Sequence, residues 1–214
     1  TGGFANPGCV VSAWPTQRPF VSPIVRNLDA GPRLDLVLPD GSTRPMTPQG
    51  AFYAYSETAA TPGAQLFIPP NGGPFRFRLP GGDDIGAGEA SVRAVDALVW
   101  REYETVSSVD RDRDLTVTWS GGEPGGFVLV RGFSYAGAAG EIFTTFGCTA
   151  PVEAGTYTVP RDVVASMVAS AGPSAGASQL SVIEISKPAR FAAPGLDNGS
   201  ISWQTSYLAP VLYR

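Results

Sequence analysis

The chain has 214 residues, 43% hydrophobic and only 16% charged, with a formal net charge of −4 and no histidine. It lacks the basic face that nucleic-acid binding requires, and no stretch approaches the roughly 18 apolar residues of a transmembrane helix. Without histidine, Ser-His-Asp and Cys-His catalysis are excluded and the commonest zinc ligand is missing, so we expect a protein that is not an enzyme.

The N-terminal part of the chain, residues 1–28, is predicted to be an extended arm. Prolines at positions 7, 15, 19 and 23 prevent a helix there, and only 9–14 is a plausible strand. Apolar side chains left in water are costly, so the arm should pack on its own domain or on a neighbouring molecule. The residues concerned are Val10, Val11, Trp14, Phe20, Val21, Ile24 and Val25.

Residues 29–96 are predicted to form a first β-sandwich. Short runs of alternating apolar and polar residues are separated by turns such as Pro-Asp-Gly and Pro-Gly-Gly. In PFRFRL, residues 74–79, the two phenylalanines face one way and the two arginines the other. This is typical of an antiparallel strand with one buried face.

Residues 97–214 are predicted to form a second β-sandwich, beginning with a hairpin over 114–135 in which GGEPGG joins two apolar runs. A phosphate-binding loop would lead from a strand into a helix and end in Gly-Lys-Ser/Thr, so GGEPGG is interpreted as a turn. Residues 161–170 are the only helical-looking stretch. The residues expected to face inward in the hairpin are Leu115, Val117, Trp119 and Phe127, Leu129 or their neighbours.

The expected fold class is therefore all-β: two immunoglobulin-like antiparallel β-sandwich domains with an extended N-terminal arm. The chain has an even number of cysteines, Cys9 and Cys148. In a secreted chain this predicts a disulfide, which would close a loop of 138 residues. A disulfide between subunits and two unpaired buried thiols are the alternatives that the sequence leaves open.

Several motifs resemble a group of functionally uncharacterised secreted bacterial proteins. They are TVTWSGGEPGGFVLVRG, FGCTAPVEAGTYTVPRDVVAS and RFAAPGLDNG, preceded by LDAGPRLDLVLPDGSTRPM. Together they cover most of residues 28–200, and WSGG, CTAP, GTYTVP and PGLD occur in the group's order. The resemblance implies export and tandem immunoglobulin-like sandwiches, and it carries no catalytic motif. The chain departs from the group in its dense acidic run at 110–114 and in its arm, which matches only around Cys9.

Acidic residues mark the candidate metal sites. Asp110, Asp112 and Asp114 have the D-x-D-x-D spacing that can surround a calcium ion, although two arginines interleave with them and could neutralise them instead. A second acidic turn lies at 83–84. Calcium is thus the one cofactor that the sequence leaves open.

Other residues fit more than one role. Glycoside hydrolysis needs two carboxyls roughly 5–10 Å apart, and the candidates Glu102, Glu104 and Glu123 show no spacing that marks a pair. Tryptophans 100, 119 and 203 occupy strand-like positions, where core packing explains them better than sugar stacking.

The favoured function is that of an extracellular structural protein, a self-assembling subunit of a bacterial surface filament or pilus-like fibre. The apolar arm could add a strand to a neighbour's sheet edge, and low charge reduces repulsion between subunits. The alternative is a monomeric secreted carbohydrate-binding or adhesion module that binds polysaccharide through aromatic side chains. An arm packed on another copy would favour assembly, and an arm packed on its own domain beside exposed aromatics would favour binding.

Overall fold

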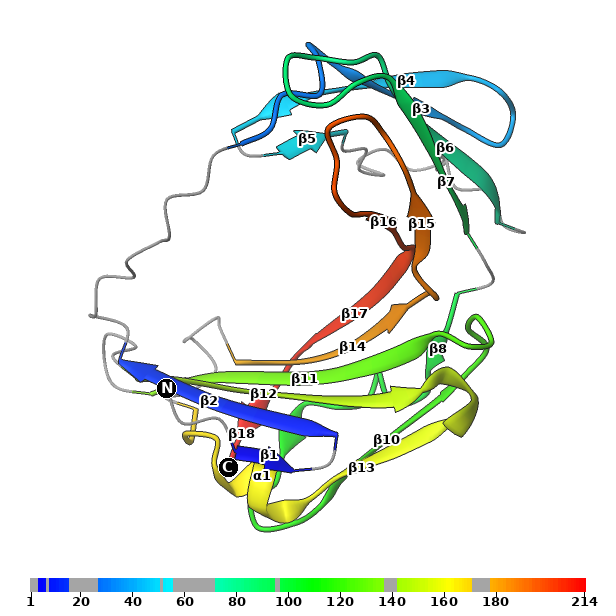
Figure 1. Cartoon of the computed structure of the whole chain (residues 1–214). Coiled ribbons are helices and arrows are strands. Elements are labelled where there is room, and N and C mark those ends of the chain that lie inside the picture. Colours follow the sequence, from blue (N-terminus) through cyan, green and yellow to red (C-terminus); the bar gives the residue numbers. More distant parts are fainter. Residues whose placement is uncertain are drawn as a thin grey trace, which may run out of the picture. The chain divides into compact units, whose positions relative to one another are not determined.

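A computed structural model of the chain describes residues 4–6, 8–15, 27–50, 52–55, 72–94, 97–136, 142–170 and 178–214. Contacts divide the chain into two compact units, each of which is built of β-strands (Figure 1). The predicted all-β class is therefore confirmed. Unit 1 consists of Thr1–Val21, Ala97–Ser186 and Gln204–Arg214, and unit 2 consists of Ser22–Asp96 and Lys187–Trp203.

The larger sheet of unit 1 is antiparallel, with six strands in the order β1-β2-β12-β11-β14-β17. Its two longest strands, β11 (Phe127–Ala136) and β12 (Ile142–Pro151), pair along their whole length. The others are β1 (Phe4–Asn6), β2 (Cys9–Pro15), β14 (Gln179–Ile185) and β17 (Gln204–Pro210).

A smaller sheet in the order β13-β10-β8 packs against one face of the larger one. Its strands are β8 (Val99–Trp100), β10 (Leu115–Ser120) and β13 (Thr156–Val159). The strands β9 (Ser108–Val109) and β18 (Leu212–Tyr213) form a separate parallel pair. Two short helices complete the unit: η1 (Val152–Ala154) and α1 (Arg161–Ala165), which covers only the first half of the predicted helical stretch.

One hydrophobic core joins the two sheets of unit 1. Val117 and Trp119 of β10 pack in the same cluster as Val128 and Val130 of β11 and Phe146 of β12, and all five are buried. Successive strand residues point to opposite faces, so these positions define the inner face of the six-stranded sheet. The residues between them point the other way.

The GGEPGG segment does not close a hairpin. β10 pairs with β8 and β13, whereas β11 pairs with β12 and β14, so the segment carries the chain from one sheet to the other. The predicted hairpin pairing over 114–135 is therefore wrong, although both strands exist. Val128 and Val130 face the core, and Phe127 and Leu129 do not. The run is apolar on both faces, so its alternation alone could not select the inner one.

The N-terminal strand β2 belongs to the sheet of unit 1 itself. It pairs with β12 from Cys9 opposite Cys148 to Pro15 opposite Ile142, and the two cysteines form a disulfide bond within the chain. The predicted disulfide is thus confirmed, and its two cysteines are 139 positions apart in the sequence.

The residues predicted to form the assembly arm are distributed differently. Val10 and Val11 lie in β2, where Val10 is 54% exposed and Val11 packs against the core. Trp14 lies in the same strand. The remaining members of the predicted arm lie outside the described residues: Phe20, Val21, Ile24 and Val25.

Unit 2 contains a five-stranded antiparallel sheet in the order β5-β4-β3-β6-β7. A hairpin from the C-terminal part of the chain packs on β7. The sheet strands are β3 (Leu34–Val37), β4 (Thr43–Gln49), β5 (Phe52–Ala54), β6 (Gly73–Leu79) and β7 (Gly88–Ala94); the hairpin strands are β15 (Ala189–Phe191) and β16 (Gly199–Ile201).

The two units are therefore discontinuous in sequence. We predicted domain boundaries at residues 28 and 96 with residues 97–214 in one domain, whereas contacts assign Lys187–Trp203 to unit 2 and the N-terminal strand to unit 1.

On β6 the predicted alternation is present, and outward-facing Arg78 contacts Glu89 of β7 at 3.1 Å.

Candidate interaction surfaces

The face of the six-stranded sheet that points away from the core carries many apolar side chains. Along β11, buried residues alternate with half-buried or exposed ones, and the strand register carries this alternation to the neighbouring strands. We define the outer face as the odd-numbered residues of β11, β12 and β14 and the even-numbered residues of β2 and β17.

Aromatic rings gather at one end of the outer face. The ring centroids of Tyr135 and Phe143 are 4.9 Å apart, and Phe133 lies 6.3 Å from each. The guanidinium carbon of Arg131 lies 6.0 Å from the Phe133 centroid, at the limit of a cation–π contact. The ring cluster therefore borders one positive charge, which lies near the middle of the outer face of β11.

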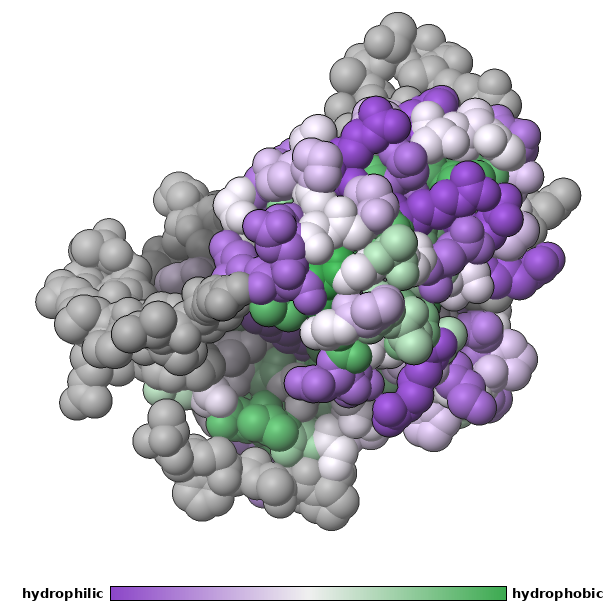
Figure 2. Space-filling model, turned by 45° about the horizontal axis from the view of Figure 1, so that its top comes forward, coloured by the Kyte–Doolittle hydropathy of each residue, from purple (hydrophilic) through white to green (hydrophobic). Residues whose placement is uncertain are grey.

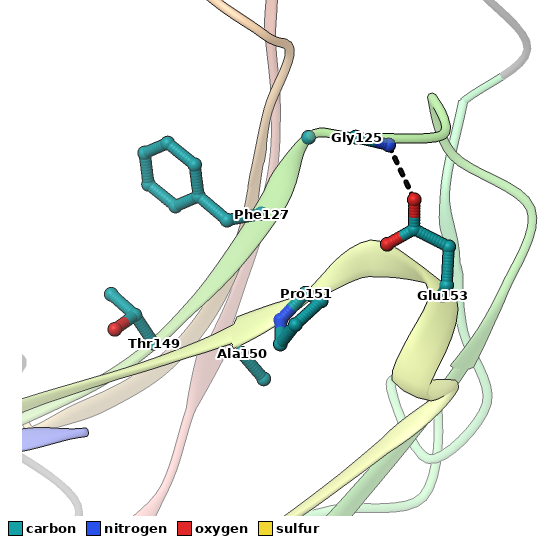
Figure 3. Close-up of a pocket in the computed structure, with 7 residues that line it drawn as sticks. Gly125, Phe127, Thr149, Ala150, Pro151 and Glu153 are labelled. Atoms are coloured by element: carbon teal, nitrogen blue, oxygen red, sulfur yellow. Dashed lines mark hydrogen bonds between the residues drawn. The ribbon is translucent and has the colours of Figure 1, made fainter. Parts of the chain in front are cut away.

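The opposite end of the outer face is largely aliphatic and continues into a shallow pocket of ≈ 580 Å³ (Figure 3). Phe127 and Thr149 point to the same side of the two strands, and Glu153 beyond them accepts a hydrogen bond from the Gly125 N–H. Hydrogen bonds from the backbone of Glu153 itself and of Gly125 lower the pKa of the Glu153 carboxyl. The pocket therefore extends an apolar surface, and its one carboxylate already has a partner.

A buried carboxylate fastens the GGEPGG segment. Glu184 of β14 is fully buried and accepts hydrogen bonds from the N–H groups of Leu98 at 3.0 Å and Glu123 at 2.7 Å. Gly122 has a φ of +88°, a conformation that favours glycine, and lies against the Glu184 carboxylate. The segment is thus part of the architecture, as its interpretation as a turn implied, and it also borders the pocket through Gly125 and Gly126.

The carboxylates of the acidic run at 110–114 have arginine and backbone partners. Asp110 is paired with Arg113 at 3.1 Å, and Asp112 with Arg161 at 3.5 Å. Asp114 accepts a hydrogen bond from the Arg161 N–H at 2.7 Å. Across the described ranges, no group of three or more His, Cys, Asp or Glu side chains could hold a metal ion. Asp110 is thus paired with one of the two interleaving arginines, as the alternative to calcium predicted, and Asp112 is paired with Arg161 instead.

Of the three glutamates considered for glycoside hydrolysis, Glu102 has a structural role. Glu102 accepts hydrogen bonds from Trp100 Nε1 at 2.9 Å and from the Thr118 N–H at 3.1 Å, and also from the Thr118 hydroxyl. Burial raises the pKa of Glu102, but these hydrogen bonds outweigh it, so that the pKa is lowered overall. Glu102 thus fixes β8 against β10, and Glu104 is exposed.

The acidic turn at 83–84 is held by Asp29. The Asp29 carboxylate accepts hydrogen bonds from the N–H groups of Gly31 at 2.7 Å and Asp83 at 3.2 Å, and both lower the pKa of Asp29. The Asp84 carboxylate accepts one from the Asp29 N–H at 2.9 Å. These carboxylates close a turn of unit 2.

Three tryptophans pack as predicted. Trp100 and Trp119 are buried in the core of unit 1, and Trp203 stacks on Phe75 in unit 2 with centroids 5.6 Å apart. The side chain of Trp14 lies outside the described set. The tryptophans whose side chains are described therefore serve packing, and the aromatic cluster on the outer face is made of phenylalanine and tyrosine.

Isolated exposed apolar side chains also occur away from the outer face. Phe52 of unit 2 is 62% exposed, and Val99 of the smaller sheet in unit 1 is 53% exposed. In Figure 2, hydrophobic residues on one side of the molecule occur in several areas between hydrophilic ones. Such scattered residues are ordinary on protein surfaces, whereas a continuous sheet face is not.

No known protein family matches the chain, and neither a curated protein nor a solved structure is significantly similar to it. The resemblance to secreted bacterial sandwich proteins therefore stays a prediction. Among the described helices, none is long and apolar enough to span a membrane.

Proposed function

We propose that the protein is a non-enzymatic extracellular structural protein, a self-assembling subunit of a bacterial surface filament or pilus-like fibre, and that both units are immunoglobulin-like sandwiches. The observation that carries this proposal is the position of β2. The strand comes from the N-terminus and lies beside β12, on the side of the sheet where only the three-residue β1 follows.

The place that β2 occupies can be filled by the same strand from another copy. Seven residues of β2 pair with β12, and Val11 packs against the core. An identical strand from a neighbour would make the same backbone hydrogen bonds, so exchange creates a subunit contact without any new interaction. In the exchanged arrangement, Cys9 of one copy meets Cys148 of the next.

Location outside the cell is supported by chemistry. The Cys9–Cys148 disulfide is of the kind that persists in oxidising compartments, and the described residues include no free cysteine. The absence of histidine from the chain removes the usual proton shuttle of enzymes. These features suit a structural subunit better than a catalyst.

Electron microscopy and non-reducing electrophoresis of the full chain test the proposal together. Strand exchange predicts filaments and a ladder of covalent multimers that collapses to monomer on reduction. The matched control is the Cys9→Ser/Cys148→Ser variant, which should show no ladder. Dispersed monomers with an internal disulfide at every concentration would overturn the proposal.

A carbohydrate-binding or adhesion module is the second candidate. It is favoured by the cluster of Phe133, Tyr135 and Phe143 and by the packing of β2 on its own unit. Affinity electrophoresis in gels containing bacterial polysaccharides tests it. Retardation that Tyr135→Ala abolishes would support this function, and unchanged mobility in all gels would exclude it for those polysaccharides.

A further inference from the structure

Strand β11 is apolar on both of its faces. Val128 and Val130 are buried in the core, while Leu129 and Phe133 lie on the outer face between Phe127 and Tyr135. Strands with two apolar faces are usual where both sides of a sheet are covered. In the part of unit 1 that the structure describes, only the inner side carries a second layer, made by β8, β10 and β13.

The same character extends over the neighbouring strands. Ile183 of β14 stands opposite Leu129, and Ile185 stands opposite Phe127. On β17, Leu208 is 50% exposed. Apolar side chains thus dominate the outer face along β11 and at one end of β14. The other strands add uncharged polar side chains to them: Ser12, Thr145, Thr149, Gln204 and Ser206.

Charge on the outer face is confined to one residue. Among the outer-face positions of the described strands, Arg131 alone is charged, and small residues flank it: Gly147 on β12 and Ser181 on β14. The described carboxylates include none that pairs with it. Arg131 therefore lies near the middle of an otherwise uncharged surface.

The size of the face suits a dimer. Five strands about 4.8 Å apart and seven or more residues long at about 3.3 Å per residue cover roughly 600 Å². Two such faces would bury about 1,200 Å² in total, the lower limit of a standard specific interface.

We propose that the outer face packs against the outer face of a second copy of this chain. Two twisted sheets stack face to face with their strands at about −30°, and a two-fold axis requires only that the surface complement itself. The end of the face around Leu129, Ile183 and Ile185 suits another apolar sheet, and Phe127 is the one ring that the described residues place there. This contact is separate from strand exchange and does not depend on it.

Arg131 gives the contact a specific signature. The two-fold axis brings Arg131 of both copies into the same apolar layer, where like charges weaken the association. Added salt should therefore strengthen the dimer, because it screens this repulsion and favours apolar burial. An anionic partner, such as an acidic peptide or polysaccharide, would show the reverse dependence.

Sedimentation velocity of the full chain over about 1–200 μM tests the proposal, a range suited to an interface near the lower size limit. The wild type should dimerise reversibly. Leu129→Arg should weaken dimerisation at least about tenfold, because it buries a second charge. The matched control is Val99→Arg, an exposed apolar residue of the smaller sheet, which should dimerise like the wild type. Arg131→Gln should dimerise more tightly and lose the salt dependence.

Three results would contradict the proposed dimer. A wild-type chain that is monomeric throughout, equal effects of Leu129→Arg and Val99→Arg, or weaker dimerisation of Arg131→Gln would overturn the proposal. Thermal unfolding followed by circular dichroism shows whether Leu129→Arg folds. If it does not fold, the dimerisation of Arg131→Gln, a substitution at an exposed position, tests the proposal alone. Non-reducing electrophoresis separates this contact from strand exchange, because face packing leaves the chains unlinked and exchange links them.

Discussion

At the scale of single residues, Gly132 is required by close packing rather than by its backbone conformation. A Cβ atom there would clash with the buried ring of Phe146 and the hydroxyl of Tyr213. We expect Gly132→Ala to lower the free energy of unfolding by about 3 kcal/mol, measured by urea denaturation. The control is Gly147→Ala, where the nearest atom is Leu129 Cδ1 at 3.4 Å and the cost should stay below about 1 kcal/mol. Equal losses would show that packing is not the reason.

Glu184 is a second residue whose role is visible only in three dimensions. Removing its carboxylate leaves the N–H groups of Leu98 and Glu123 without their acceptor. We expect Glu184→Ala to destabilise unit 1 by about 3 kcal/mol in the same urea assay. Glu89→Ala, which breaks only the exposed ion pairs with Arg76 and Arg78, should cost less than about 0.5 kcal/mol. A neutral Glu184→Ala would mean that water replaces the carboxylate.

At the scale of elements, alternation in the sequence located most strands but not their partners. The run from 127 to 135 was correctly predicted to be a strand, yet Phe127 and Val128 are both apolar, so the buried face was decided by β10 and β13. The GGEPGG turn was predicted as a hairpin because glycine allows many reversals. Whether it crosses between sheets depends on contacts such as Glu184, which are remote in sequence and carry no local signal.

Removing the disulfide tests how much this covalent link between β2 and β12 contributes to the free energy of unfolding. It joins residues 139 positions apart, so in the unfolded chain it restricts a very large loop. The chain-entropy argument gives about 4–5 kcal/mol for such a closure. We expect Cys9→Ala/Cys148→Ala to lose most of this in guanidinium unfolding, and the reduced wild type to match the variant. A loss below about 1 kcal/mol would contradict the entropy argument.

At the scale of the whole molecule, composition predicted an all-β chain but not the discontinuous division into units. The strands of unit 2 between residues 34 and 94 are joined by a hairpin from 189–201, and unit 1 takes a strand from each end of the chain. Turn signals are local and say nothing of which sheet a later strand joins. For the same reason the sequence left calcium open for the acidic run at 110–114, since Arg161, which pairs with Asp112, lies far away in sequence.

The stability of the whole molecule should depend on pH only in the acidic range. Histidine is absent, so no side chain with an ordinary pKa titrates between about pH 5 and pH 8. The free energy of unfolding should therefore be constant in this range. The carboxyl pKa values of Asp29, Asp40, Glu102 and Glu153 are lowered from ordinary values of 3.8 for aspartate and 4.5 for glutamate. Between the folded and ordinary values the unfolded chain binds more protons, so stability there rises with pH.

We therefore expect the melting temperature to be constant above about pH 5 and to fall as the pH drops through the lowered pKa values, measured by calorimetry from about pH 2.5 to 8. Glu102→Gln should reduce the slope of this fall, because the amide keeps a hydrogen-bond acceptor for Thr118 but cannot titrate. Asp162→Asn, at an exposed aspartate, is the control and should leave the slope unchanged. A melting temperature that rises as the pH falls would require carboxyls whose pKa is raised by folding, and would contradict the hydrogen bonding described for these groups.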